Sequence, residues 1–301
     1  MKISVMIATF NRCLELQRTL TKLLELDPPP DEILLCADGC TDRTVETVRR
    51  EFSTCVLLEN VHKRGSIFSR NRLLRAAIGE IVASFDDDSY PLDRDFCARL
   101  KDLFGEYPEA AVISFPEIRD GEVFAHPTKL PSSPAYLISA YANCAAAMRR
   151  DVYLRSDGFP EFFHHMYEEP DYTLQCYALG YVARFEPSLA VRHHVTTNQR
   201  DLISRHHQNA RNELWSVLIR CPFPQLIPVA LFRIWRQFRY ACSEGIAWAI
   251  REPRWWLAAL RGIPNCFRSR HAIPWRIYYA WMKLARSAPA AAMLSIPRGQ
   301  S

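Results

Sequence analysis

The chain has 301 residues, of which 49% are hydrophobic and 24% charged, with a formal net charge of +5; this balance excludes a disordered protein. Its ten cysteines are scattered from Cys13 to Cys266 without a CxxC pair or a zinc-like His/Cys spacing, which favours reduced thiols in a cytosol. The apolar run 3–8 is too short for a signal peptide and the uncharged stretch 130–148 is too polar for a membrane span, so we expect a cytoplasmic protein, soluble or peripheral.

Short β-rich runs alternate with helical patterns over the first hundred residues. Residues 3–8 predict a buried strand, and residues 12–26 a helix with its leucines on one side. The alternation continues through strand 32–37, a helix capped by Thr41 or Asp42, strand 55–58, helix 67–78 and strand 81–85. This spacing predicts an α/β fold: an open, mostly parallel twisted sheet with helices on both faces.

Three of these strands end in polar residues. Residues 8–12 (ATFNR) follow the first strand, residues 38–42 (DGCTD) the second, and Asp86, Asp87 and Asp88 the fourth. Ligands of open α/β sheets bind at the carboxyl ends of the strands, so all three segments border the expected site. Taken singly, the first two are also ordinary turn sequences.

The aspartate triplet carries the strongest chemical signal. Three carboxylates directly after an apolar strand repel one another, and a divalent cation, Mg²⁺ or Mn²⁺, is the natural counter-charge. If the strand continues, Asp86 and Asp88 project to one side and Asp87 to the other. One aspartate then binds the metal and another the ribose or a metal-bound water. The alternative is a solvated acidic turn that caps a helix near residues 93–95.

Five segments, in this order and spacing, resemble a family 2 glycosyltransferase with a GT-A fold: ATFNR, DGCTDRT, GSIFSRNRLLRAAIGEIVASFDDD, SDGFPEFF and YEEPDYTLQCYALGYVARFEP. The resemblance covers residues 3–194. It implies transfer of a sugar, with inversion, from a nucleotide diphosphate sugar (UDP- or dTDP-linked) to a hydroxyl of a glycan or lipid-linked acceptor in cell-surface polysaccharide or glycolipid assembly. It also implies a divalent metal and a carboxylate base.

The resemblance assigns roles to residues of this chain. It implies a donor site formed by Thr9, Phe10, Asn11, Arg12, Asp38, Arg70, Asn71, Asp86 and Asp87. It implies metal binding by the D-x-D pair, Asp86 and Asp88. The acceptor loop corresponds to Asp157, Gly158 and Phe159, in which Asp157 replaces a glycine of the family pattern.

An acidic pair, Glu168 and Glu169, stands where the family has its catalytic carboxylate. The match gives the base position to Glu169, with a glutamate in place of the family's aspartate, and Glu168 is the second candidate. General-base work is sensitive to a displacement of about one bond length. The alternative is that both are first-turn acids favoured by the dipole of a helix that starts near Pro170.

Two histidines, His193 and His194, follow the predicted strand 181–186. GT-A enzymes often place a histidine near the metal and the pyrophosphate, and an imidazole ligand favours Mn²⁺ over Mg²⁺. The alternative for either histidine is a structural role.

Two other classes of function share parts of this pattern. A nucleotidyltransferase has an open sheet and metal-binding carboxylates, but usually also a Gly-rich, Lys-containing phosphate loop, and none follows Ala8. A non-catalytic nucleotide-sugar or carbohydrate-binding protein on the same fold would not need Asp86, Asp88 and Glu169. We therefore predict a GT-A catalytic domain at residues 1–195.

Residues 196–301 differ in composition and predict a helical region. From Arg200 onward there are 16 Lys/Arg against 4 Asp/Glu, a net charge of +12, and the segment holds all seven tryptophans; residues 1–199 carry a net of −7. Two patterns are amphipathic, one with Leu231, Trp235 and Phe238 opposite Arg233, Arg236 and Gln237, the other with Ile277, Tyr278 and Trp281 opposite Arg276 and Lys283.

Basic amphipathic helices with tryptophan suit the surface of an anionic membrane, and a lipid-linked acceptor would give that location a purpose. We expect no nucleic-acid partner, because the basic residues alternate with apolar faces and form no exposed tract. The alternative is that the apolar faces pack on the catalytic domain or on a second subunit.

Overall fold

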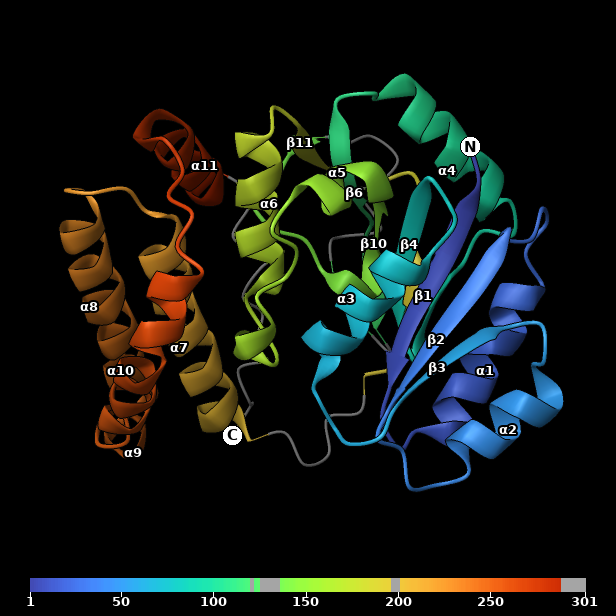
Figure 1. Cartoon of the computed structure of the whole chain (residues 1–301), viewed down its shortest axis with the longest axis horizontal. Helices are drawn as coiled ribbons and strands as arrows, with labels where there is room; N and C mark the ends of the chain where they lie inside the picture. The colour runs from blue at the N-terminus through green and yellow to red at the C-terminus, as the bar shows by residue number, and fades with distance from the viewer. Residues whose placement is uncertain (120–121, 125–135, 196–200, 288–301) are drawn as a thin grey trace.

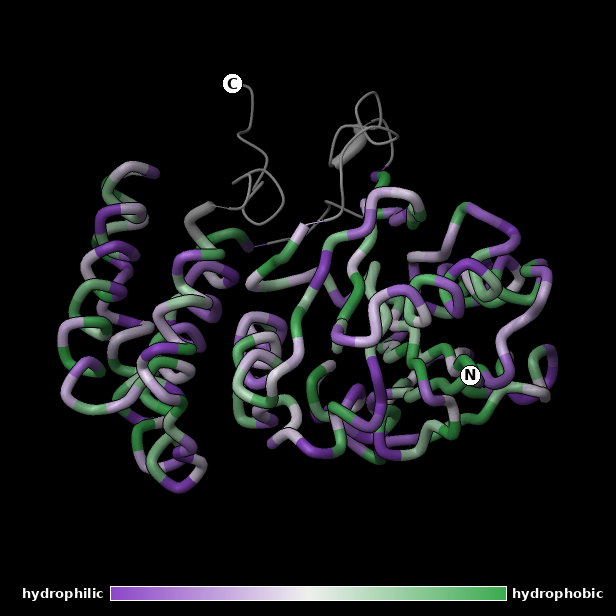
Figure 2. Tube along the Cα trace, turned by 90° about the horizontal axis from the view of Figure 1, so that it is seen from above, coloured by the Kyte–Doolittle hydropathy of each residue, from purple (hydrophilic) through white to green (hydrophobic). Residues whose placement is uncertain are grey.

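The computed structural model describes residues 1–119, 122–124, 136–195 and 201–287. A layered α/β body lies beside a group of C-terminal helices at one end of the molecule (Figure 1). Figure 2 shows the same two parts from above, with polar and apolar residues mixed along each C-terminal helix. The predicted α/β fold with a helical C-terminal region is confirmed.

The first half of the main sheet is parallel, in the order β3-β2-β1-β4. Its strands are β1 (Ile3–Thr9), β2 (Glu32–Asp38), β3 (Val56–Asn60) and β4 (Ile81–Asp86). The helices between them are α1 (Cys13–Leu24), α2 (Thr44–Glu51) and α3 (Ser66–Ala76). Strands β1 and β4 are almost wholly buried, because both of their faces are covered by helices.

The second half of the sheet breaks the parallel pattern. Strand β10 (Ala146–Arg149) lies between β4 and β6 (Ala110–Ser114) and is antiparallel to both. Beyond β6 come β11 (Val182–Phe185) and the edge strand β9 (Tyr136–Leu137). The expected sheet is therefore confirmed as mostly parallel, with β10 and the edge strand β9 as its antiparallel members.

A second sheet of four short strands brings distant segments to the end of β4. Its order is β5-β12-β7-β8, formed by β5 (Ser89–Pro91), β12 (Val191–His193), β7 (Glu117–Arg119) and β8 (Glu122–Phe124). In this sheet His193 pairs with Ser89 of β5, directly after the aspartate triplet. Residues more than a hundred positions apart in sequence thus share one small surface.

Helices cover both faces of the main sheet, each over its own apolar core. Leu20 of α1, Val48 of α2 and Phe104 of α4 (Phe96–Glu106) belong to one core. The other core contains Leu73 of α3 and Tyr172 of α6 (Glu168–Ala178), together with the short helices α5 (Arg150–Arg155) and η3 (Glu161–Phe163). A 3-10 turn, η2 (Asn143–Ala145), leads into β10. All ten cysteines are free thiols.

The C-terminal helices pack on this second core. They are α7 (Leu202–Arg220), α8 (Leu226–Glu244), α9 (Ile246–Ala249), α10 (Pro253–Arg268) and α11 (Trp275–Ser287). Trp215 donates to the carbonyl of Ala259 at 2.9 Å, and a side chain at Gly262 would collide with the Trp215 ring. Because Trp215 and Cys266 also belong to the core around α6, the helices share an apolar interior with the catalytic fold.

Helix α8 turns its polar side inward and its apolar side outward. Arg233 and Arg236 pair with the buried Glu213 of α7 at 3.0 and 2.5 Å. On the opposite side, Leu231 and Trp235 are 63% and 51% exposed. These two side chains therefore do not pack on the catalytic domain, whereas Leu226 and Ile234 of the same helix join apolar clusters with neighbouring helices. No helix of the described residues is long and apolar enough to span a bilayer.

Helix α11 has the reverse orientation. Tyr278 and Trp281 are buried, and Trp281 donates to the carbonyl of Ser139 at 2.9 Å. Trp215 and Trp255 are buried as well. The expectation of a lipid-facing surface is therefore wrong for α11, and part of the tryptophan enrichment serves the interior.

Candidate active site

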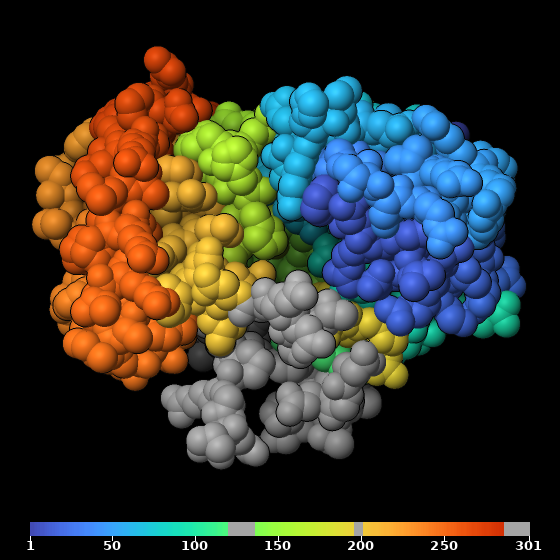
Figure 3. Space-filling view, turned by 90° about the horizontal axis from the view of Figure 1, so that it is seen from below, coloured from blue at the N-terminus to red at the C-terminus, as the bar shows by residue number. Residues whose placement is uncertain are grey.

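The carboxyl ends of β1, β2 and β4 meet at one edge of the sheet. Strand β1 pairs with β2 on one side and with β4 on the other, so that Ala8 lies between Cys36 and Asp86. Figure 3 views this edge and shows a hollow between the N-terminal segments and the light-green segment that contains α6. The three polar segments predicted to border the site are thus neighbours.

Asp86 is linked to helix α6 through an arginine. Arg70 of α3 donates to Asp86 Oδ1 at 2.6 Å and to Glu168 Oε1 at 3.1 Å, and Asn143 donates to the same Glu168 oxygen at 3.3 Å. Burial disfavours the charge on Arg70, but the two carboxylates outweigh it and raise the pKa of the guanidinium. Arg70 therefore connects the predicted metal ligand to the predicted base helix.

Asp87 and Asp88 share a second arginine. Arg12 lies 3.3 Å from Asp87 Oδ1 and donates to Asp88 Oδ2 at 2.7 Å. Asp87 also accepts from the Thr9 hydroxyl at 2.8 Å, and its backbone carbonyl accepts from Thr19. Burial raises the pKa of Asp87 to about 7. The loop after β1 thus holds the second and third aspartates.

His193 lies between two carboxylates. Its Nε2 is 3.0 Å from Asp88 Oδ1, and its Nδ1 is 2.5 Å from Glu117 Oε1 on the neighbouring strand β7. Burial disfavours a charged ring, but hydrogen bonding to these carboxylates prevails and raises the pKa of His193. Burial likewise opposes ionisation of Asp88, yet His193 and Arg12 lower the pKa of that carboxyl.

These contacts correct two expectations about the triplet. It is no solvated turn that caps the next helix: Asp87 and Asp88 are 6% and 1% exposed, and the residue before α4 is Asp95. Strand β4 ends at Asp86, so the strand alternation does not extend to the other two. The protein itself supplies cationic counter-charges, from Arg12, Arg70 and His193.

The residues nevertheless fit a divalent cation. Ligand atoms of Asp86, Asp88 and His193 lie within 4.8 Å of one another. Although Nε2 of His193 is close to Asp88 Oδ1, that oxygen is buried and has no hydrogen bond of acceptable geometry. Two carboxylates and an imidazole suit Mn²⁺. His194 is not part of this group; its ring lies 3.0 Å from the Tyr90 hydroxyl.

Glu168 and Glu169 open helix α6 after Tyr167, which has a left-handed backbone (φ 70°). Glu168 is 1% exposed and held by Arg70. Glu169 is partly exposed, and no cation of the described residues lies within ion-pairing distance of it. Burial and the Glu168 carboxylate raise the pKa of Glu169 to about 8. The two acids that the sequence left as alternatives therefore have different environments.

The loops after β1 and β2 hold each other in place. Asn11, with a positive φ of 53°, accepts from the Thr41 amide at 2.7 Å. Asp38 accepts from the amides of Arg64 and Gly65 at 2.8 and 2.7 Å. Lys63 lies over the Phe10 ring at 3.8 Å. Phe10 is 36% exposed and lies under this cation.

Asn71, predicted to line the donor site, holds the predicted acceptor loop in place. It donates to the Phe159 carbonyl at 2.9 Å and accepts from the Phe159 amide and the Tyr153 hydroxyl. Gly158 has φ +71°, and a Cβ there would lie 3.0 Å from the Tyr153 hydroxyl. A glycine is therefore favoured both by the backbone and by the space.

Asp157, where the family pattern has a glycine, contacts the C-terminal region. Its carboxylate accepts from Arg220 and lies 3.1 Å from His271 Nδ1. Arg220 also binds the fully buried Asp171 of α6, with its Nη2 3.0 Å from Oδ2. With an aspartate at position 157, Arg220 of α7 contacts both the predicted acceptor loop and α6, the helix that begins with the predicted base.

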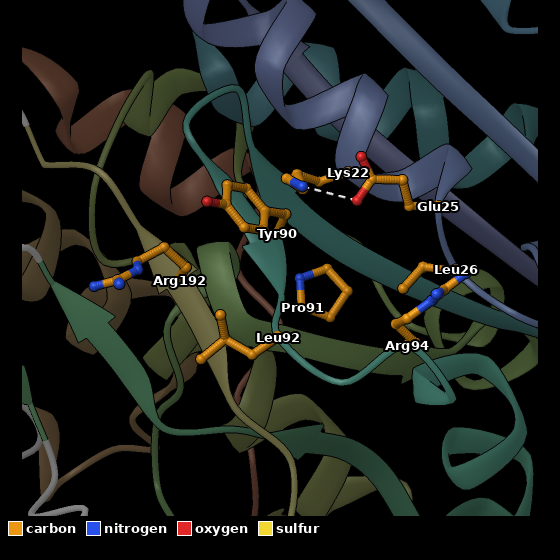
Figure 4. A pocket seen from close by; sticks show the side chains of 8 residues that line it. All are labelled: Lys22, Glu25, Leu26, Tyr90, Pro91, Leu92, Arg94 and Arg192. Carbon is orange, nitrogen blue, oxygen red and sulfur yellow. Dashed lines mark hydrogen bonds and ion pairs between the residues drawn. The ribbon is translucent and has the colours of Figure 1, made fainter.

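Two cavities lie away from the aspartates. One, of about 270 Å³, is lined by Tyr90, Arg192 and the ion pair of Lys22 with Glu25 and holds none of the predicted site residues (Figure 4). A larger one, of about 630 Å³, includes the acceptor loop and the segment 268–271.

A model of the family described as "Glycosyl transferase family 2" matches residues 4–167. No curated protein sequence matches the chain. Among solved structures, the chain resembles the mannosyltransferase PcManGT from Pyrobaculum calidifontis in complex with GDP-Man and Mn²⁺, at 18% identity and a TM-score of 0.58, over 96% of this chain and 88% of that one.

Two further structures share the fold. S. aureus TarS 1-349 in complex with UDP-GlcNAc is 17% identical with a TM-score of 0.63, over 97% of this chain and 90% of that one. GalNAc-T7 with UDP, GalNAc and Mn²⁺ is 14% identical with a TM-score of 0.60, over 74% of this chain and 48% of that one.

Proposed function

The chain belongs to glycosyltransferase family 2, and on that premise we propose that it transfers a sugar from a nucleoside diphosphate sugar to an acceptor hydroxyl with inversion. The observation that carries the proposal is the cluster of Asp86, Asp88 and His193 at the end of β4, joined through Arg70 to the helix that begins with Glu168 and Glu169. One arginine thus connects the proposed donor-binding carboxylates to the helix that carries the candidate base.

Asp86, Asp88 and His193 would hold the divalent cation, and the imidazole favours Mn²⁺ over Mg²⁺. PcManGT and GalNAc-T7 are both complexes with Mn²⁺. When bound, the metal supplies electrostatic stabilisation of the leaving nucleoside diphosphate. Arg70 and Arg12, already directed at the aspartates, add positive charge on the same side of the site.

Glu169 is the base in this proposal. Its carboxylate takes the proton of the acceptor hydroxyl while that oxygen forms a bond to the anomeric carbon, and the bond from this carbon to the diphosphate oxygen breaks. Attack from the face opposite the leaving group inverts the anomeric centre. Glu169 is suited to this because it is partly exposed and free of ion pairs within the described residues, whereas Glu168 is buried against Arg70.

We assign the donor to UDP- or dTDP-sugars and the acceptor to glycans or lipid-linked glycans of the cell surface. The solved relatives bind GDP-Man and UDP-GlcNAc, which supports a nucleoside diphosphate sugar as the class. The exposed apolar side of α8 supports a peripheral location on an anionic membrane, at its cytoplasmic face, where a lipid-linked acceptor is presented.

Release of nucleoside diphosphate tests the enzymatic proposal. The full chain is incubated with a panel of nucleotide sugars, Mn²⁺ and glycan or lipid-linked acceptors. Steady release that depends on the acceptor and stops with chelator supports a transferase. Binding of a donor without acceptor-dependent turnover across the panel would instead favour a non-catalytic binding protein.

A further inference from the structure

The two ring nitrogens of His193 face different carboxylates. Nε2 faces Asp88, one of the proposed metal ligands, and Nδ1 faces Glu117, which belongs to no motif of the sequence analysis. The Nδ1–Oε1 distance of 2.5 Å is that of a short, charge-assisted hydrogen bond. Glu117 thus contacts His193, a proposed metal ligand, through the ring nitrogen that does not face Asp88.

A neutral imidazole has one lone pair and one N–H, so only one nitrogen can bind a metal and the other must carry the proton. A carboxylate is an acceptor only, and it therefore keeps the proton on the nitrogen that it faces. We propose that Glu117 is a positioning residue that holds the proton on Nδ1 of His193 and so presents the Nε2 lone pair to the metal beside Asp86 and Asp88. This rests on the metal dependence of the proposed function.

Glu117 is itself fixed in place. It belongs to β7, which pairs with β12 in parallel register, with Arg119 opposite His193. Arg119 Nε donates to Glu117 Oε1 at 2.5 Å, and so the carboxylate has a cationic partner besides the imidazole. Histidine ligands commonly donate their second N–H to such a carboxylate, which fixes the tautomer and orients the ring. The small second sheet, absent from the sequence-based prediction, provides this geometry.

The same residues allow a competing arrangement. Glu117, Cys144 and His193 form a second group whose ligand atoms lie within 4.8 Å of one another. A thiophilic cation such as Zn²⁺ at this group would use Nδ1 and leave the proton on Nε2. The two arrangements exclude each other, because they place the proton of His193 on different ring nitrogens. Only the second arrangement uses Cys144 as a metal ligand.

Mn²⁺ binding to the full chain, measured by the electron paramagnetic resonance of free Mn²⁺, distinguishes them. Glu117→Gln keeps the shape but offers both a donor and an acceptor to Nδ1, so it no longer fixes the proton. We expect about 10- to 100-fold weaker Mn²⁺ binding. Cys144→Ser and the remote Glu109→Gln, which removes an ion pair with Arg184, should bind as the wild type does.

Spin-echo modulation of bound Mn²⁺ gives a readout that needs no variant to fold: the wild type should show a directly bound imidazole nitrogen. Wild-type affinity in Glu117→Gln, or a loss in Cys144→Ser as large as in Glu117→Gln, would overturn the proposal. If the wild type binds Mn²⁺ without a nitrogen ligand, this inference fails while the metal dependence of the proposed function stands. If it binds no Mn²⁺ at all, both fail.

Discussion

Glu168 and Glu169 are adjacent in sequence, yet a single substitution in each should have different effects. Glu169→Gln removes only the proton acceptor, so we expect normal folding and donor binding with turnover lowered by orders of magnitude. Glu168→Gln leaves Arg70 without one of its two carboxylates, so we expect a lower unfolding midpoint. Single-turnover kinetics and thermal unfolding of both variants provide the comparison. Normal turnover in Glu169→Gln with none in Glu168→Gln would move the base by one residue.

The pH dependence of transfer also reports on Glu169. Because burial and Glu168 raise its pKa to about 8, the deprotonated, basic form is the minor form at neutral pH. The rate should therefore rise with pH and level off above about 8, and the residual activity of Glu169→Gln should lack this rise. A wild-type profile that is flat between pH 6 and 9 would show that Glu169 does not limit the rate.

Residues that carry a motif could be predicted, and residues that act through a partner could not. Asp86 and Asp88 follow a strand that periodicity reveals, and Glu169 is selected by the resemblance to family 2 glycosyltransferases. Asn143 and Glu117 have no such signal, because their partners, Glu168 and His193, lie 25 and 76 positions away. For the same reason, the sequence did not show that the counter-charges of the triplet come from the protein.

Among the elements, α6 and α7 depend on one buried pair. Arg220 contacts both the buried Asp171 and the acceptor-loop residue Asp157. Arg220→Met should destabilise the protein by about 3–5 kcal/mol, because Asp171 then loses its cationic partner and keeps only the hydrogen bonds from Ser216 and Gln175. Urea unfolding measures this, with the exposed Arg268→Met as the control. A loss no larger than in the control would mean that α7 is held by its apolar contacts alone.

Polar contacts between helices explain why helical amphipathicity predicted the C-terminal region only in part. The 3.6-residue pattern shows that a helix has an apolar face but not where that face points. In α8 a buried acid, Glu213, draws the arginines inward, whereas in α11 Trp281 finds Ser139 in the interior. Such pairing between helices is invisible to periodicity.

The exposed side of α8 predicts membrane binding that surface substitutions should remove. Leu231→Ser with Trp235→Ser should lower binding to anionic liposomes about tenfold or more, since an apolar side chain contributes about 1.5–3 kcal/mol when fully transferred. Flotation with increasing anionic lipid and salt measures it, and the fold should be unaffected because both side chains are exposed. Leu154→Ser, at an exposed apolar residue of α5, serves as the control. Wild-type protein that fails to float on any lipid would contradict the proposed location.

At the scale of the whole molecule, the sheet edge, the small second sheet and α6 form one site, and the C-terminal helices complete its support. The basic region shares a core with the catalytic fold through Trp215 and Cys266, so its removal would uncover apolar surface and the buried Asp171. Membrane and acceptor binding should therefore be tested with point substitutions in the full chain and not with a truncated chain. The boundary at residues 195 and 196 stays a prediction.

The most direct test of the central claim is calorimetric titration of the full chain with a panel of nucleotide sugars, in Mn²⁺ and in chelator. A site built from Asp86, Asp88 and His193 should bind at least one nucleoside diphosphate sugar in Mn²⁺ and lose that binding in chelator. The variant Asp88→Asn, which keeps the size of the side chain, should bind no donor either in Mn²⁺ or in chelator. Equal binding in Mn²⁺ and in chelator, or no binding of any donor in Mn²⁺, would contradict the account.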